Sequence, residues 1–329
     1  MDSSAYKYSI AAFYHFGPVP KDQLKDLSKR LEDHAKNENV RGLVILATEG
    51  VNGTISAESK ETLEAYLNFI SETLSFPKLE PKWSGAEAWP FRKFAVRIRP
   101  EIVTLGKPEV QPLPPHSPRH LSPEEWHRMM EEEDVIVLDT RNWYETKIGK
   151  FAGAIDPNIE EFREFSDFLD KSDLPKDKKI LIYCTGGIRC EKAIVEMENK
   201  GFTNVYQLDG GILNYLAKFP NQKFEGECFV FDHRVAVDQY LNPTKQYKMC
   251  PHCGQPADQK IQCRRCETEA VVCIDCLDKE EARHTCSKNC AHHYRLAPGK
   301  KGRPQFQGYR SRALKQLRQQ RAQQNPSAR

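Results

Sequence analysis

A cysteine followed by a glycine pair and an arginine offers the clearest chemistry in this chain. The segment YCTGGIRC places these residues at Cys184, Gly186, Gly187 and Arg189. An apolar run ends at Cys184 and a helix-like sequence follows, so the glycines permit a tight loop whose backbone N–H groups converge on the sulfur. These N–H groups, the helix N-terminus and Arg189 all favour thiolate over thiol. The loop therefore predicts a nucleophilic cysteine, or a persulfide held in the same anion cradle.

The number of residues between Cys184 and Arg189 indicates the size of the anion that the loop can bind. Tyrosine-phosphatase loops place one more residue between Cys and Arg to cradle a phosphate, whereas four residues separate Cys184 from Arg189. The smaller loop fits sulfur better. The alternative is that Cys184 is an ordinary buried cysteine, which leaves the glycines and the arginine unexplained. Cys190 is either a resolving thiol or a small residue in the first helical turn, and we favour the second.

Eight further cysteines form four close pairs nearer the C-terminus. Eight thiolates suit two tetrahedral zinc sites with four thiolates each, and a segment with so few aliphatic residues gains folding free energy from bound metal. The alternatives are an iron–sulfur cluster, whose usual cysteine run is missing, a nearby histidine in place of one thiolate, and reduced, unligated thiols. The spacing leaves the pairing open. The predicted metal ligands are Cys250, Cys253, Cys263, Cys266, Cys273, Cys276, Cys286 and Cys290.

Composition limits the kinds of protein this can be. The chain has 329 residues, of which 39% are hydrophobic and 29% charged, enough for two or three domains. Its mean hydropathy is −0.67, and no apolar run approaches the ~20 residues of a membrane span. The first residues lead directly into a strand pattern and do not resemble a secretory signal. We therefore predict a cytoplasmic protein without a membrane span, in which paired cysteines are more typical of metal sites than of disulfides.

The first part of the chain has the pattern of an α+β domain. Within residues 1–106, the runs YSIAAFYHF and RGLVILA predict strands, and DQLKDLSKRLEDHAK and ETLEAYLNFISETL predict helices. FRKFAVRIRPEIVTLG predicts a closing strand pair. The order β-α-β-β-α-β is typical of a ferredoxin-like split-βαβ sandwich. Five prolines then mark residues 107–120 as a linker.

Residues 121–221 have the pattern of an α/β domain. Aliphatic runs such as DVIVLD and KKILIYC alternate with helical segments, which predicts a parallel sheet. Functional residues in such sheets gather at the carboxyl ends of strands. Cys184 and Asp139 both stand at such ends, so Asp139 is a second candidate pocket residue. For Arg141 and Glu145 we favour a buried salt-bridge network.

The C-terminal part combines the cysteine-rich module, residues 222–294, with a basic tail, residues 295–329. The tail holds ten Lys and Arg and no Asp or Glu. Such a segment is usually a solvated, disordered end, and composition alone favours that interpretation. A segment of one charge sign is also suited to binding a polyanion such as nucleic acid.

Several segments resemble known families. Three are similar to recurrent segments of the rhodanese superfamily: CTGGIR at 184–189, DTRNWYE at 139–145 and QLDGGILNY at 207–215. Three more together resemble the bacterial tRNA uridine-34 hydroxylases of that superfamily: ATEGVNGT at 47–54, YCTGGIRCEK at 183–192 and FVFD at 229–232. The resemblance spans roughly residues 8–290. One departure is His233, where the family motif FVFDER has Glu.

The resemblance implies an enzyme with a rhodanese-type central domain. The implied reaction is the oxygen-dependent conversion of the wobble uridine of tRNA to 5-hydroxyuridine, with molecular oxygen as co-substrate and Cys184 essential. We expect the N-terminal and cysteine-rich domains to help grip the anticodon arm. A thiolate that adds to uridine C6 can activate C5, and a peroxy or persulfide species on the thiol is a second route. The sequence has neither a dinucleotide fingerprint nor a two-His-one-carboxylate iron motif, so it does not identify the reductant.

Two other functions remain open on sequence alone. A persulfide-forming sulfurtransferase, acting on thiosulfate or feeding tRNA thiolation, needs only the central domain, and leaves the N-terminal domain, cysteine module and tail without a role. A non-catalytic RNA-binding or scaffold protein leaves the Cys184 loop without a role, and we rank it last.

Overall fold

The computed structural model describes residues 6–112, 117–132 and 134–296. The chain divides into two compact units, residues 1–245 and 246–329. Because the described ranges end at residue 296 and omit residues 113–116, most of the predicted basic tail and part of the predicted linker lie outside them. Across the described ranges, no helix combines the length and the apolar character that crossing a membrane requires.

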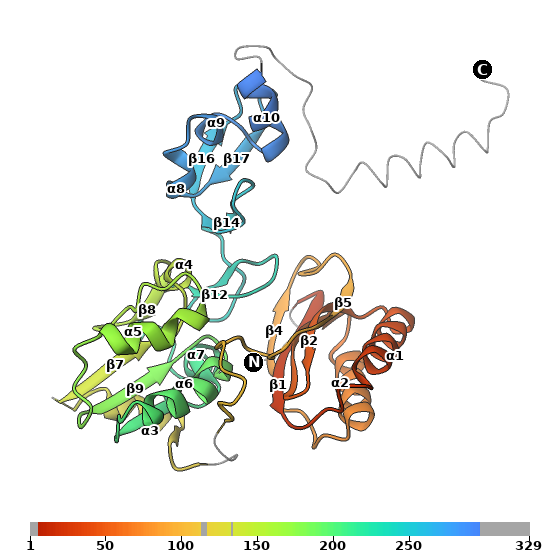
Figure 1. The fold of residues 1–329 in the computed structure, drawn as a ribbon. Coiled ribbons are helices and arrows are strands. Elements are labelled where there is room, and N and C mark those ends of the chain that lie inside the picture. Colours follow the sequence, from red (N-terminus) through yellow and green to blue (C-terminus); the bar gives the residue numbers. More distant parts are fainter. Residues whose placement is uncertain (1–5, 113–116, 133, 297–329) are drawn as a thin grey trace. The chain divides into compact units, whose positions relative to one another are not determined.

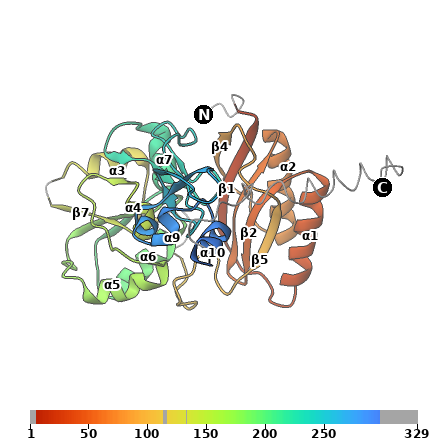
Figure 2. The ribbon, with the colours of Figure 1, turned by 90° about the horizontal axis from the view of Figure 1, so that it is seen from above.

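The first unit begins with a five-stranded sheet in the order β4-β1-β3-β2-β5. Two helices cover one face of this sheet (Figures 1 and 2). The first four strands have the predicted β-α-β-β-α-β order, and β5 adds to the edge, parallel to β2. The elements are β1 (Tyr8–Phe16), α1 (Leu24–Asn37), β2 (Arg41–Ala47), β3 (Gly50–Ala57), α2 (Lys60–Leu74), β4 (Lys82–Ala86) and β5 (Phe94–Ile98).

The closing strand differs from the prediction. Strand β4 pairs antiparallel with β1 and completes the split-βαβ arrangement, whereas the predicted strand pair between residues 91 and 106 supplies only β5. The sequence of β4, KWSGA, has no β-branched residue and includes a glycine, so its local preference for a strand is weak. Its pairing with β1 decides its conformation.

Alternation along the strands gives this sheet two distinct faces. In β1, Ala11 and Phe13 belong to the apolar core beneath the helices, where α1 contributes Leu27 and Leu31. The neighbouring residue Tyr14 therefore faces the other way, because successive side chains of a strand point to opposite faces. Tyr14 thus lies on the helix-free face of the sheet.

The next part of the chain builds a separate four-stranded parallel sheet in the order β6-β10-β9-β7. Helices α5 and α6 pack on one face, around Ile180 and Ile182, and α3 and α7 pack on the other, around Leu181 and Tyr183. The predicted combination of α+β and parallel α/β architecture is confirmed. The elements are β6 (His120–Leu121), α3 (Pro123–Met129), β7 (Val135–Asp139), α4 (Trp143–Thr146), β8 (Gly149–Phe151), η2 (Phe162–Glu164), α5 (Phe165–Lys171), β9 (Lys179–Tyr183), α6 (Ile188–Asn199), β10 (Val205–Leu208), α7 (Gly211–Lys218), β11 (Phe224–Gly226), β12 (Cys228–Phe229) and β13 (Ala236–Val237).

The second unit is small and has two minor cores, each built largely of cysteine side chains. So little aliphatic area is a weak basis for an independent fold. Its elements are β14 (Lys248–Met249), β15 (Pro256–Ala257), β16 (Gln259–Gln262), β17 (Glu269–Val272), α8 (Ile274–Leu277), α9 (Glu280–Arg283) and α10 (Lys288–Leu296).

Candidate active site and metal centres

The Cys184 loop connects the end of β9 to the start of α6, as the sequence predicts. Gly187 adopts φ +99°, in the left-handed region that favours glycine. Its backbone N–H donates a hydrogen bond to Sγ of Cys184 at 3.1 Å. The sulfur therefore lies inside a turn of backbone donors at a helix N-terminus, the arrangement suited to an anion.

The surroundings of Cys184 favour its thiolate. Burial raises the pKa of Cys184, and a hydrogen bond from the Cys190 thiol lowers it. The charge of Arg189 and the backbone N–H groups of Arg189 and Gly187 lower it further, and the net result is a pKa of about 6. Burial and the neighbouring Cys184 raise the pKa of Cys190 well above its ordinary value, so this thiol keeps its proton and acts as a donor. Cys184 is therefore mostly thiolate at neutral pH.

Arg189 is held rigidly beside the thiolate. Its guanidinium donates to both carboxylate oxygens of Glu145, at 2.8 and 2.7 Å, and both side chains are buried. Such a bidentate pair fixes the arginine geometrically. Glu145 thus positions Arg189 beside the sulfur. This agrees with the sequence analysis, which favoured a buried salt bridge for Glu145.

Asp139 is not among the residues that line the cavity next to the Cys184 loop, which is described below. It is fully buried, and its carboxylate accepts hydrogen bonds from the Arg141 guanidinium at 2.7 to 3.1 Å. Arg141 also donates to the carbonyl of Gly149 at 2.6 Å. The two residues form a buried ion pair that ties β7 to β8, so the structure gives Asp139 a scaffolding position at its strand end.

The N-terminus of α7 supports the Cys184 loop from behind. The backbone N–H of Ile212 donates to the Cys184 carbonyl at 2.9 Å, and that of Leu213 donates to the Thr185 carbonyl at 3.1 Å. A Cβ atom at Gly211, where φ is +66°, would lie 2.5 Å from the Cys184 carbonyl oxygen. Gly211 therefore allows the close approach of helix and loop, as expected of a tight strand-to-helix turn.

A cavity of about 600 Å³ opens over the Cys184 loop. One side consists of loop residues, among them Cys184, Gly186 and Arg189, and the other is the helix-free face of the N-terminal sheet, including Tyr14 and Lys82. Its volume lies within the range of small-molecule sites. The N-terminal domain thus completes a cavity that the parallel-sheet domain alone leaves open.

Tyr14 and Lys82 were not identified from the sequence. The Tyr14 hydroxyl donates to Glu191 at 2.9 Å, and burial and Glu191 raise the Tyr14 pKa well above its usual value. A Cβ at Gly187 would lie 3.0 Å from that hydroxyl, so Tyr14 packs against the Cys184 loop. The alternation of buried and exposed side chains along β1 could have predicted that Tyr14 lies on the face without helices. The sequence of β4 does not predict a strand, so it could not have placed Lys82.

The FVFD segment contributes one border of the cavity. Phe231 lines it and keeps 57% of its surface exposed, with the Arg189 guanidinium 5.6 Å from the ring centre. Arg234 pairs with Asp232 at 2.6 Å and donates to Ser84 Oγ of β4 at 2.8 Å. His233, which replaces the family Glu, is not among the lining residues and donates its backbone N–H to a carbonyl of the N-terminal domain.

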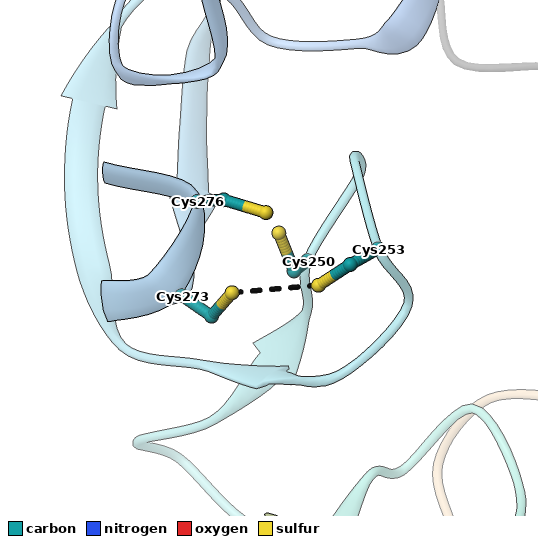
Figure 3. A group of neighbouring side chains, drawn as sticks. All are labelled: Cys250, Cys253, Cys273 and Cys276. Atoms are coloured by element: carbon teal, nitrogen blue, oxygen red, sulfur yellow. Dashed lines mark hydrogen bonds between the residues drawn. The ribbon is translucent and has the colours of Figure 1, made fainter. Parts of the chain in front are cut away.

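The eight predicted metal ligands form two groups of four in the second unit. Within each group the sulfur atoms all lie within 4.8 Å of one another. Figure 3 shows the four sulfurs of the first group converging from two separate segments. The first group is Cys250, Cys253, Cys273 and Cys276, and the second is Cys263, Cys266, Cys286 and Cys290.

The sulfur geometry fits a tetrahedral metal ion. Zn–S bonds of about 2.3 Å in a tetrahedron place neighbouring sulfurs about 3.8 Å apart. The Cys253 and Cys273 sulfurs lie 3.4 Å apart, and in the second group the Cys290 sulfur lies 3.8 Å from both Cys266 and Cys286. Both groups can therefore bind a metal such as zinc through four thiolates.

The order of the ligands is interleaved. The first cysteine pair joins the third, and the second joins the fourth, so each metal would link segments on either side of the other site's ligands. Sequence spacing had left this pairing open, because it specifies the close pairs and not their partners.

Comparison with known proteins covers nearly the whole chain. Residues 8–102 match the UPF0176 acylphosphatase like domain, residues 122–218 match the Rhodanese-like domain, and residues 225–291 match the Rhodanase C-terminal family. A protein of Bdellovibrio bacteriovorus named tRNA uridine(34) hydroxylase is 52% identical over 305 residues, which cover 92% of this chain and 86% of that protein.

More distant relatives have the same name. Those from a Synechococcus species and from Agrobacterium fabrum are each 39% identical to this chain, over 83% of its length. The aligned regions cover 92% and 86% of these two proteins. The similarity is therefore not confined to the Cys184 domain and includes the N-terminal and C-terminal regions.

Proposed function

The chain belongs to the tRNA uridine(34) hydroxylase family, and we propose that it converts the wobble uridine of tRNA to 5-hydroxyuridine with the Cys184 thiolate acting on the base. The family membership that the sequence motifs predict is confirmed. The observation that carries the proposal is the Cys184 sulfur, which accepts a hydrogen bond from the Gly187 N–H and lies with Arg189 in the lining of a cavity of about 600 Å³. That cavity has room for a nucleobase turned out of the anticodon loop.

The proposed roles of the site residues follow from their contacts. Cys184 is the nucleophile, and the loop formed by Gly186 and Gly187 supplies backbone donors for its anion. Arg189, fixed by Glu145, provides a permanent positive charge beside the sulfur. Molecular oxygen is the proposed co-substrate.

The proposed macromolecular partner is the anticodon arm of tRNA. The N-terminal domain lines one side of the cavity. It thereby offers a second surface that can contact the anticodon arm. A sulfurtransferase that acts on small molecules does not need such a surface. A tRNA substrate also places the proposed reaction in the cytoplasm.

Zinc is the proposed occupant of both cysteine groups. Four thiolates complete a tetrahedral coordination sphere and leave no open position for water or substrate, as in structural zinc sites. The ions would hold the second unit together, in place of the aliphatic core that it lacks.

The test is nucleoside mass spectrometry of tRNA from cells lacking this protein. Complementation with the wild-type chain restores 5-hydroxyuridine and its derivatives, and Cys184→Ser does not. Cys228→Ala is a matched control, because Cys228 is also buried but is not among the residues lining the cavity. Persistence of 5-hydroxyuridine in the deletion strain, with a fall in thiolated nucleosides, would replace the proposal with the sulfurtransferase function.

A further inference from the structure

Lys82 presents a cation to the cavity from the side opposite Cys184. It is the first residue of β4, and its Cδ lies 3.9 Å from the position that a Cβ would occupy at Gly186. Its ammonium lies 4.8 Å from the centre of the Tyr14 ring. The lysine therefore packs directly against the catalytic loop.

The Lys82 ammonium has neither an ion pair nor a hydrogen bond within the described part of the chain. Lys82 is partly buried. The more deeply buried cations of this unit all have carboxylate partners: Arg141 pairs with Asp139, Arg189 with Glu145, and Lys192 with two glutamates. Burial lowers the pKa of Lys82, and the more distant charges of Asp209 and Cys184 oppose this effect.

Even partial burial of a cation that has no ion pair or hydrogen bond costs free energy. A fold stabilised by this lysine would be expected to place a carboxylate against it, as it does for Lys192. A cation held ready in a cavity is instead suited to negative charge that develops on a substrate during reaction.

We propose that the Lys82 ammonium binds the O4 oxygen of the target uracil and stabilises the enolate formed when Cys184 adds to C6. This inference rests on the proposed function. In the step, the Sγ–C6 bond forms and the electron pair of the C5=C6 bond moves through C4 to O4. The negative charge of the thiolate passes to O4, and nothing is oxidised or reduced.

The enolate makes C5 nucleophilic, ready for the oxygen species in the complete reaction. Without oxygen, C5 takes a proton from solvent, and loss of a C5 proton followed by expulsion of the thiolate regenerates uridine. The hydrogen at C5 is thereby exchanged with solvent. Lys82, facing O4, lowers the barrier in both directions.

The experiment follows this exchange at uridine 34 in unmodified tRNA, incubated anaerobically in D₂O with the full-length protein. We expect wild type to exchange the C5 hydrogen, Cys184→Ser to abolish exchange, and Lys82→Gln to slow it about 100-fold, as removal of one oxyanion donor does. Lys82→Arg should recover part of the rate. Lys60→Gln is the control, since Lys60 lies on the same domain and is exposed.

A second measurement separates stabilisation of the enolate from an effect on the thiolate. The pH midpoint of Cys184 alkylation should rise in Lys82→Gln by far less than the factor by which exchange slows, because Cys190, Arg189 and the backbone N–H groups are the main causes that lower the Cys184 pKa. The tRNA affinity of this variant should change little. A slowed exchange together with a midpoint displaced upward by the same factor would overturn the proposal, because Lys82 would then act through the sulfur. Wild-type exchange in Lys82→Gln would overturn it as well.

The wild type separates this inference from the proposed function. If it forms 5-hydroxyuridine in air yet exchanges no C5 hydrogen, addition at C6 is wrong and the hydroxylase function remains. If it does neither, both proposals fail.

Discussion

The ammonium of Lys192 lies 2.6 Å from a carboxylate oxygen of Glu101, and both side chains are buried. Lys192 belongs to α6, the helix that begins at the Cys184 loop, whereas Glu101 follows the N-terminal sheet. Glu49, from the ATEGVNGT segment, approaches the same ammonium at 2.8 Å. This cluster of three charges links the two domains that line the cavity over the Cys184 loop.

Replacing Lys192 with Met should therefore destabilise the first unit strongly. The two glutamates would remain buried without their cation, and loss of one partner from a buried pair typically costs about 3–5 kcal/mol. Urea unfolding followed by tryptophan fluorescence measures the effect, because all four tryptophans lie in the first unit. Lys60→Met removes an exposed ion pair with Glu64, and we expect a change under about 1 kcal/mol. Equal effects of the two substitutions would contradict this role of Lys192.

Alkylation of Cys184 should depend on pH with a midpoint of about 6. The thiolate is the reactive form, so the rate rises with pH below the midpoint and levels off above it. Arg189→Met removes the adjacent charge and should move the midpoint upward. Peptide-resolved mass spectrometry with iodoacetamide gives the rate for each cysteine. Cys228, whose burial raises its pKa to about 12, serves as an internal control. A midpoint near 9 in the wild type would contradict the thiolate assignment.

Gly211→Ala should impair catalysis by displacing the Cys184 loop. The added Cβ would lie 2.5 Å from the Cys184 carbonyl oxygen, too close for a fixed backbone contact. Gly153→Ala is the matched control, because Gly153 has a similar φ of +71° and nothing within 4 Å of its Cβ position. Both variants carry a backbone strain of about 1–2 kcal/mol. Only Gly211→Ala should lose 5-hydroxyuridine formation in tRNA, by about tenfold or more, and equal activities would show that the close approach is unimportant.

Metal analysis of purified protein should find two ions per chain, and double variants test the interleaved pairing. Removing two ligands of one group, Cys253→Ala with Cys276→Ala, should leave one ion. Cys253→Ala with Cys266→Ala affects both groups and should leave none. Pairing of sequence neighbours predicts the opposite results. Cys228→Ala, outside both groups, should keep two ions.

The basic tail is expected to strengthen binding of tRNA. Its lysines and arginines can release counterions from the phosphate backbone, so truncation after Pro298 should lower the affinity and flatten its dependence on salt. Filter binding at several salt concentrations measures the slope. A full-length chain with those residues replaced by Gln separates charge from chain length. Unchanged slopes in both variants would assign the tail to a solvated end.

Local patterns in the sequence were enough to identify the chemical groups. The Cys184 loop was recognisable because its strand end, glycines and helix start are contiguous, so short-range geometry fixes the backbone donors around the sulfur. The cysteine pairs were recognisable for the same reason, since two ligands on one tight turn are local. The parallel sheet followed from buried aliphatic runs that need no long-range information to identify.

Tertiary structure alone decided which of these groups meet. It brought alternate cysteine pairs together in each group of four. It also formed the ion pair of Asp139 with Arg141, away from the cavity, and that of Arg189 with Glu145. Finally, it made the weak strand KWSGA an edge strand of the N-terminal sheet and so brought Lys82 next to the Cys184 loop. Such contacts join residues far apart in the chain, and their free energy depends on burial and charge in the folded state, which residue spacing does not encode.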